Sequence, residues 1–143
     1  ASREIYDTIL ANVETPIELF HGYTTSGHPL ACAAGIATLD TFKEERLFER
    51  AAEIAPYWED ALHSLKGEPH IVDIRNLGLI GGIELAPRAD GNRAGEVFRK
   101  CFDAGVFVRY TGDVLAMSPP LIVEKAQIDQ IVDAVRTALK STA

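Results

Sequence analysis

Long apolar stretches, cysteine clusters and basic blocks are all missing from this sequence. No run approaches the roughly 18 consecutive apolar residues that a membrane-spanning helix needs, so we expect a cytoplasmic location and no membrane partner. The two cysteines, Cys32 and Cys101, lie far apart in apolar helical patterns and form no CxxC or Cys/His spacing. We expect both to be buried free thiols rather than metal ligands or a disulfide.

Positive charge and the common nucleophile motifs are also scarce. The chain carries 21 acidic against 14 basic residues, a net charge of −7, without long blocks of one sign. It therefore offers no basic stripe to nucleic acid. It contains no G-x-S-x-G motif and no Walker loop. The histidines (His21, His28, His63 and His70) have no acidic neighbour at a spacing typical of metal sites or triads, so they are weak candidates for metal ligands or general bases.

What the sequence does contain is the composition of an ordinary globular protein. Its 143 residues, 47% of them hydrophobic and 24% charged, suit one domain with a substantial core. Periodicity predicts, in order, a helix over residues 30–42, a long helix over 44–65, strands at 70–74 and 79–85, a helix over 94–102, strands at 106–110 and 114–118, and a helix over 128–139. This order predicts an α/β or α+β fold, with a small, mostly antiparallel sheet covered by helices on one face. The pair Gly81-Gly82 inside a predicted strand indicates a β-bulge or a close approach of the backbone.

The stretch "HGYTTSGHP", residues 21–29, precedes the first, Ala-rich helix. Thr24, Thr25 and Ser26 supply hydroxyl groups, and Pro29 suits the first turn of a helix. A helix N-terminus has unpaired N–H groups and the positive end of the helix dipole, so this pattern favours an anion. The alternative is that a serine or threonine only caps the helix.

Arg109 interrupts an apolar strand next to a "TGD" turn that is typical of a hairpin. A guanidinium group placed there can hold a carboxylate through two parallel hydrogen bonds. Alternatively, Arg109 lies on an edge strand and faces water, or its partner is Asp113 in the turn. The spacing alone leaves these alternatives open.

Three blocks are more informative together than any one of them alone. They are "FHGYTTSGHPLACAAGIATLD" (residues 20–40), "IRNLGLIGGIEL" (74–85) and "VFVRYTGDVLAMSPPL" (106–121). In order and spacing they resemble the C-terminal part of the class III aminotransferases, which are fold-type I enzymes that use pyridoxal 5'-phosphate (PLP). Within that family, "DIRNLGLIGGIELAPR" and "RYTGD" are most similar to the ω-amino acid (β-alanine):pyruvate aminotransferases.

The resemblance implies roles for three residues. Thr24 would cross the interface of a homodimer to bind the PLP phosphate of the neighbouring subunit, and Tyr23 would approach the same phosphate. Arg109 would be the mobile arginine that binds the substrate carboxylate and swings aside for amines that lack one. Thr25 departs from the family, which usually has an aromatic residue there, and this departure concerns the packing beside the phosphate.

The Schiff-base lysine of the family has no match in this sequence. The lysines present (Lys43, Lys66, Lys100, Lys125 and Lys140) lie in helical or loop settings with polar or charged neighbours. In the family, that lysine lies N-terminal to the part seen here. The resemblance therefore implies that residues 1–29 are a remnant of the large PLP-binding domain and residues 30–143 are the C-terminal small domain.

The resemblance also implies a reaction. The parent enzyme would move an amino group from an ω-amino acid or amine to pyruvate, whereas the chain alone would be inactive, would contain no catalytic residue and would not retain PLP. One alternative is another class III PLP enzyme, either a different aminotransferase or an aminomutase. The other is a non-catalytic interaction module.

Overall fold

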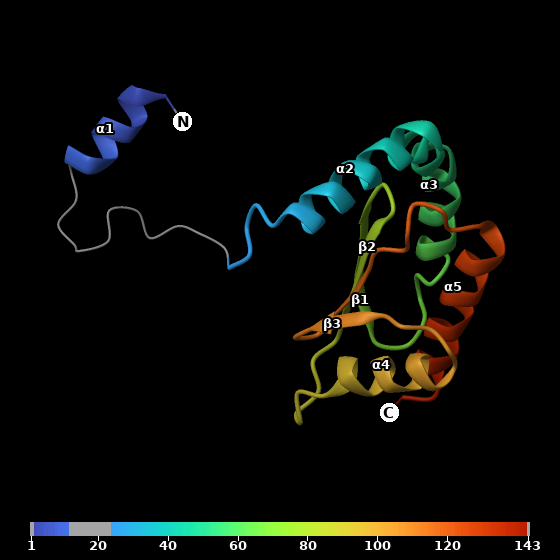
Figure 1. Ribbon diagram of the computed structural model, residues 1–143. Coiled ribbons are helices and arrows are strands. Elements are labelled where there is room, and N and C mark those ends of the chain that lie inside the picture. The colour runs from blue at the N-terminus through green and yellow to red at the C-terminus, as the bar shows by residue number, and fades with distance from the viewer. Residues whose placement is uncertain (1, 12–23, 143) are drawn as a thin grey trace. The chain divides into compact units, whose positions relative to one another are not determined.

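The chain contains two compact units, Ala1–Asp40 and Thr41–Ala143. The computed structural model describes residues 2–11 and 24–142. The first unit holds helix α1 (Arg3–Ala11) and most of helix α2 (Pro29–Glu44) (Figure 1). Helix α2 begins at Pro29, as the sequence predicts, because a proline at the first helical position loses no hydrogen bond. In the parts of the chain that are described, no helix is long and apolar enough to cross a membrane.

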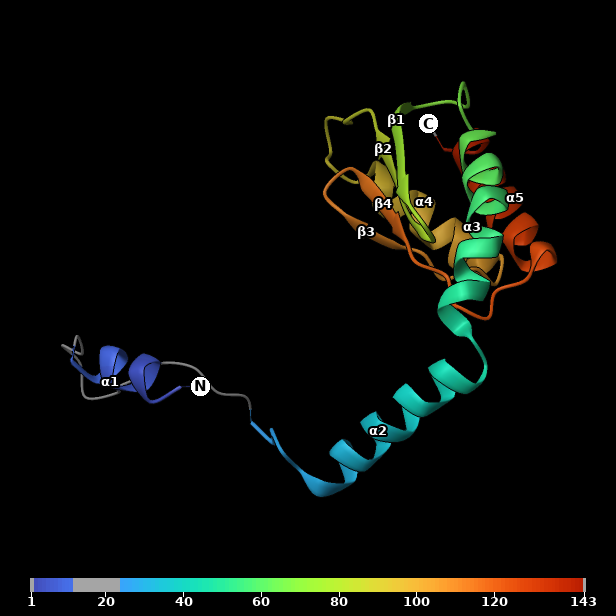
Figure 2. The same ribbon diagram turned by 90° about the horizontal axis from the view of Figure 1, so that it is seen from above.

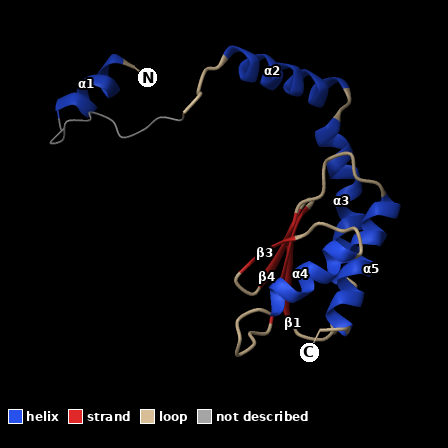
Figure 3. Ribbon diagram, turned by 60° about the horizontal axis from the view of Figure 1, so that its bottom comes forward, coloured by secondary structure: helices blue, strands red, loops and turns tan. Residues whose placement is uncertain are grey.

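The second unit is built around a four-stranded antiparallel sheet (Figure 3). Its elements are α3 (Leu47–His63), β1 (Ile71–Leu77), β2 (Ile80–Leu85), α4 (Arg93–Asp103), β3 (Arg109–Thr111), β4 (Val114–Met117) and α5 (Lys125–Lys140). The strands pair in the order β1-β2-β4-β3. From α2 onward the predicted order of helices and strands is confirmed, and so is the hairpin that places Arg109 on a strand, whereas helix α1 is not among the predicted elements.

Two strand ends differ from the prediction by more than one residue. Strand β1 continues through Asn76 to Leu77, because its partner β2 begins only at Ile80 and pairs with that end. Strand β3 begins at Arg109, three residues later than expected, because its ladder with β4 begins at the pair Arg109 and Ala116, and residues 106–108 line a cavity instead.

The helices α3, α4 and α5 cover one face of the sheet, as predicted (Figure 2). Their apolar stripes and the inward side chains of the strands form one core, whose fully buried members include Trp58, Leu62, Ile83, Val97, Leu115, Ile128 and Leu139. The opposite face is polar near its centre, where the Arg75 guanidinium lies 2.9 Å from Asp73 and 3.0 Å from Glu84. Burial on one face only is a common arrangement for antiparallel sheets.

The two cysteines differ in burial. Cys101 on α4 is fully buried, whereas Cys32 on α2 is exposed. Every residue of α2, all of them described, is at least partly exposed. A helical apolar pattern identifies the face that is able to pack but not whether another element covers it. The prediction of a buried thiol is therefore confirmed for Cys101 and wrong for Cys32.

Gly81 allows α3 to pack directly on β2. A methyl group at this position would lie 2.8 Å from Leu62 Cδ2 and 3.1 Å from Trp58 Cζ2, and both of these side chains are fully buried. The close approach that the glycine pair indicates is thus present at Gly81. The register irregularity of the sheet lies elsewhere, on β1 between Ile71 and Asp73.

We expect Gly81→Ala to lower the free energy of unfolding by about 1–3 kcal/mol, because the added methyl group overpacks the core. The matched control is Gly82→Ala, whose methyl group would meet only Arg75 and Val114 atoms at 3.7–3.8 Å. That change should stay within about 0.5 kcal/mol of the unmodified chain. Urea unfolding measures both, and equal losses in the two variants would contradict the assigned contact.

The cysteine environments predict selective thiol chemistry. In the folded chain, Cys32 should react with a disulfide reagent, whereas Cys101 should not, because burial covers its sulfur and raises the pKa of its thiol to about 11. A colorimetric thiol assay should count one reactive group before unfolding and two after it. A folded Cys32→Ser variant that still reacts rapidly would refute this assignment.

Candidate functional site

The turn before α2 has an unusual backbone for its residues. Thr25 has a φ of 68° and Gly27 a φ of 77°. The His28 N–H donates to the Thr25 carbonyl at 3.1 Å, and the Cys32 N–H donates to the His28 carbonyl at 2.9 Å. Left-handed backbone is costly for a β-branched residue such as threonine, and such strain is concentrated at functional positions in proteins.

The hydroxyl groups of this turn remain available. Thr24, Thr25 and Ser26 are exposed, and their side chains make no hydrogen bond with any residue that the structure describes. The capping alternative is therefore not seen within the described residues. Three hydroxyl groups beside a helix N-terminus suit an anion, since the dipole and the first N–H groups of α2 favour negative charge. Tyr23, the other predicted phosphate contact, lies outside the described residues.

A cavity of about 460 Å³ opens where β3 and β4 separate. The pair Arg109 and Ala116 is the last of this ladder. Residues 105–108, which precede Arg109, and residues 117–120, which follow Ala116, line the cavity together with the start of α5. Its walls are mostly apolar, and Arg109 is the only cationic residue among those that line it.

The sheet register surrounds Arg109 with small residues. Arg109 lies opposite Ala116, which lies opposite Gly82, which in turn lies opposite Arg75. Residues directly opposite one another in antiparallel strands point to the same face. Arg109 and Arg75 are therefore on the face that the helices leave open, separated by two positions that have almost no side chain.

Arg109 and Arg75 differ in their partners. Arg75 pairs with Asp73 and Glu84, and these hydrogen bonds raise the pKa of its guanidinium further. Arg109 is exposed, and its side chain makes no ion pair or hydrogen bond with any described residue. The alternative partner, Asp113, forms no ion pair with it; the Asp113 carbonyl accepts a hydrogen bond from the Leu85 N–H at 2.9 Å. Within the described residues, the Arg109 guanidinium thus has no partner that would compete with an external carboxylate.

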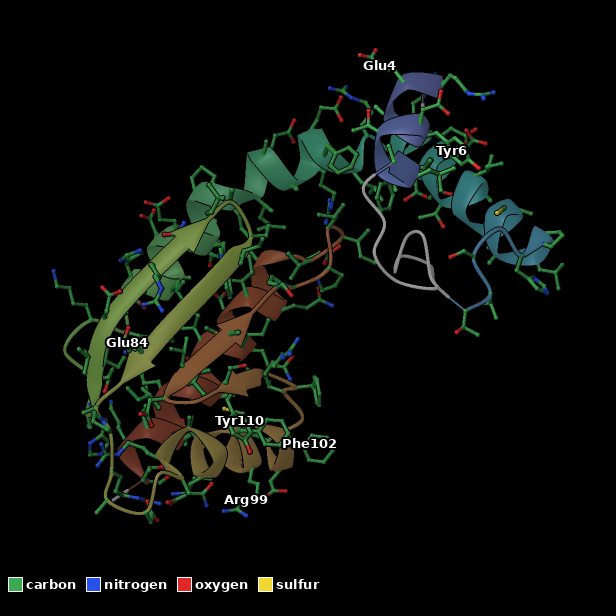
Figure 4. The ribbon with its side chains drawn as sticks, turned by 90° about the vertical axis from the view of Figure 1, so that its left-hand side faces the viewer. Glu4, Tyr6, Glu84, Arg99, Phe102 and Tyr110 are labelled. Atoms are coloured by element: carbon green, nitrogen blue, oxygen red, sulfur yellow. The ribbon has the colours of Figure 1, made fainter. Side chains whose placement is uncertain are left out.

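An aromatic cluster lies behind Arg109, against α4. The centroid of the Phe98 ring lies 5.5 Å from that of Tyr110, 5.8 Å from that of Phe107 and 6.2 Å from that of Phe102. Figure 4 shows Tyr110 of β3 beside α4, which also carries Phe102. Phe98 and Phe102 lie in the helix predicted over residues 94–102, and the sequence alone gives them no role at the site. The available signal is the position of Phe107 and Tyr110 on either side of Arg109 in "VFVRY".

The lysines do not form a site with Arg109. Lys100 pairs with Glu96 at 2.8 Å, Lys140 lies 3.5 Å from Glu68, and Lys125 lies 4.8 Å from the centre of the Tyr57 ring. Lys43 and Lys66 are exposed. None of the five lines the cavity beside Arg109. Over the described ranges there is also no cluster of three His, Cys, Asp or Glu residues that is able to hold a metal ion.

Comparison with known proteins gives the same family over nearly the whole chain. The model of the family "Aminotransferase class-III" matches residues 1–139. An omega-aminotransferase from Caulobacter vibrioides is 57% identical over 141 residues, which cover 97% of this chain and 32% of that protein. A beta-alanine–pyruvate aminotransferase from Pseudomonas aeruginosa is 44% identical over 148 residues, which cover 100% of this chain and 33% of that protein.

Solved structures also resemble this fold. The adenosylmethionine-8-amino-7-oxononanoate aminotransferase from Methanocaldococcus jannaschii has a TM-score of 0.80 at 32% identity, over 97% of this chain and 34% of that one. An omega-aminotransferase from Paracoccus denitrificans has a TM-score of 0.78 at 27% identity, over 87% of this chain and 29% of that one. The chain thus spans about a third of the length of the curated relatives that it matches.

Proposed function

Because this chain belongs to the class III aminotransferases, we propose that it is part of a PLP enzyme that moves an amino group from an ω-amino acid or amine to pyruvate. The observation that carries this proposal is Arg109, which is exposed, is among the residues that line an open cavity, and has a side chain without an ion pair or hydrogen bond to any described residue. ω-Amino acids and pyruvate share one feature, a carboxylate, and an arginine fork binds a carboxylate through two parallel hydrogen bonds.

The family implies PLP as the cofactor, and the first unit suits its phosphate. PLP, when bound, would supply the electron sink and carry the amino group. Thr24 would donate its hydroxyl to the phosphate of the PLP in the neighbouring subunit of a homodimer, and Tyr23 would lie next to that phosphate. The free hydroxyl groups beside the start of α2 support this assignment, since a dianion gains from both the donors and the dipole.

We also propose that the chain includes parts of two domains. Residues 1–29 would belong to the large cofactor domain and residues 30–143 to the small domain. The Schiff-base lysine would lie outside these 143 residues, because each lysine here is either exposed or engaged in surface contacts such as Lys100 with Glu96. A lysine that works on a bound cofactor needs a desolvated, enclosed setting.

A second candidate is another reaction of the same family. Gamma-aminobutyrate transaminases from Oryza sativa are 34% identical to this chain, and the Aquifex aeolicus adenosylmethionine-8-amino-7-oxononanoate aminotransferase is 32% identical. The higher identity, 57% and 44%, to the omega-aminotransferase and the beta-alanine–pyruvate aminotransferase favours the ω-amino acid reaction.

The chain by itself should not retain PLP. After it is mixed with an equimolar amount of PLP and dialysed, its visible absorbance should return to that of the untreated protein, because no enclosed lysine is present to hold the cofactor. The complete enzyme, treated in the same way, is the positive control. Stoichiometric visible absorbance that survives dialysis of the 143-residue chain would refute the proposed location of the lysine.

In the complete enzyme, Arg109→Ala should act on carboxylate-bearing donors only. The half-reaction with the donor alone, followed by stopped-flow absorbance, avoids the carboxylate of pyruvate. The apparent second-order rate constant for β-alanine should fall by about 10- to 100-fold, as expected for a lost charge-assisted hydrogen-bond pair. That for n-butylamine should change by less than about twofold, since this donor has no carboxylate to bind.

The control for this experiment is Arg99→Ala. Arg99 is exposed on α4, and like Arg109 it has no partner among the described residues. Its removal changes the net charge equally and should leave both donors unaffected. Equal losses for β-alanine and n-butylamine in Arg109→Ala would show that Arg109 does not recognise the carboxylate.

A further inference from the structure

We propose that Phe98 is a positioning residue that holds the backbone on both sides of Arg109 and thereby sets where the substrate carboxylate binds; this inference rests on the role proposed for Arg109. A single ring of α4 packs against Phe107, two residues before Arg109, and against Tyr110, the residue after it. No other described aromatic ring contacts both of these residues.

Strand pairing by itself holds Arg109 weakly. Strand β3 has only three residues and lies at the edge of the sheet, where β4 is its one neighbouring strand. Arg109 is the first residue of β3, and the four residues before it leave the ladder to line the cavity. Short edge strands with exposed hydrogen bonds open readily. The backbone at Arg109 therefore needs support from another element.

The contacts of Phe98 supply that support from the helix side. Its ring lies 5.5 Å from that of Tyr110 with an interplanar angle of 45°, and 5.8 Å from that of Phe107 with an angle of 83°. The second arrangement is edge-to-face, a favoured geometry for aromatic pairs. Phe98 itself packs on the main core.

Gly95 brings Tyr110 down onto α4. A methyl group at Gly95 would lie 3.3 Å from Tyr110 Oη and 3.4 Å from Cζ, so the tyrosine ring rests on the first turn of the helix. The next residue, Glu96, lies 2.8 Å from both Arg88 and Lys100 and so ties this turn to the preceding loop and to the rest of α4. The surface that carries Tyr110 is therefore itself well anchored.

Neighbouring side chains of β3 point to opposite faces of the sheet. Tyr110 points toward α4, whereas Arg109 points to the open face, in the row of Ala116 and Gly82. The aromatic contacts hold the backbone, while the guanidinium has no partner in the part of the chain that the structure describes. Loss of the Phe98 ring should let the strand shift and so move the carboxylate site, without removing any group that binds the carboxylate.

Two variants of α4 test this inference. Phe98→Leu removes the ring that contacts both Phe107 and Tyr110, whereas the matched control Phe102→Leu removes a ring on the same helix that has no contact with Tyr110. Phe98→Tyr keeps the ring and should behave as the unmodified protein. If Phe98→Leu does not fold, Phe98→Met replaces it, because methionine also removes the ring but is flexible enough to fill the space that the ring leaves.

The first measurement needs no cofactor. Hydrogen–deuterium exchange of the 143-residue chain, read on peptides that span residues 107–112, should be about 10-fold faster in Phe98→Leu than in Phe102→Leu. The second measurement is the donor half-reaction of the complete enzyme. There, Phe98→Leu should raise the donor concentration for half-maximal rate about five- to tenfold for β-alanine and leave n-butylamine within about twofold.

The outcomes separate the two proposals. Equal exchange in Phe98→Leu and Phe102→Leu, or equal losses for the two donors in Phe98→Leu, would overturn the positioning role while leaving the function of Arg109 intact. If Arg109→Ala lowers the rates with β-alanine and n-butylamine equally, the proposed role of Arg109 is wrong, and the positioning role that depends on it is wrong as well. Faster exchange together with a selective loss for β-alanine, and recovery of both in Phe98→Tyr, would support it.

Discussion

The contact of α3 with Gly81 is the constraint on which the second unit depends. Trp58 and Leu62 reach the backbone of β2 there because no side chain stands between them. Strand β2 is an inner strand of the sheet, β4 pairs with its other edge, and β3 pairs with β4. The position of Arg109 thus follows from a helix packed on a strand two places away, through ladders that transmit the register residue by residue.

The fold of the second unit follows closely from local patterns in the sequence. The apolar stripe from Leu47 to Leu65 and the "TGD" turn are short-range signals, so periodicity and turn chemistry were sufficient to predict the long helix and the second hairpin. Strand ends were not predictable in this way, because they depend on the partner: β1 continues to Leu77 because Ile80 of β2 pairs with it. The exposure of Cys32 was missed for a related reason, since burial depends on which other element covers a face.

The candidate site was predictable in its residues but not in their surroundings. The motifs and the family resemblance identified Thr24 and Arg109, and both lie among the described residues. That Arg109 has small neighbours depends on Gly82 and Ala116, which the register of three strands brings beside it. Phe98 belongs to a helical stripe that looks like ordinary core, and only the three-dimensional contacts connect it with Arg109.

The small residues beside Arg109 have a consequence for conformational entropy. An arginine side chain carries about 2 kcal/mol of rotamer entropy, and with glycine and alanine next to it Arg109 keeps this freedom when nothing is bound. A carboxylate must order the whole side chain, which limits its net affinity, whereas a ligand without a carboxylate leaves the guanidinium in water and creates no buried unpaired charge. The same pair of small residues would let the carboxylate site that we propose at Arg109 favour acids and still tolerate ligands that lack a carboxylate.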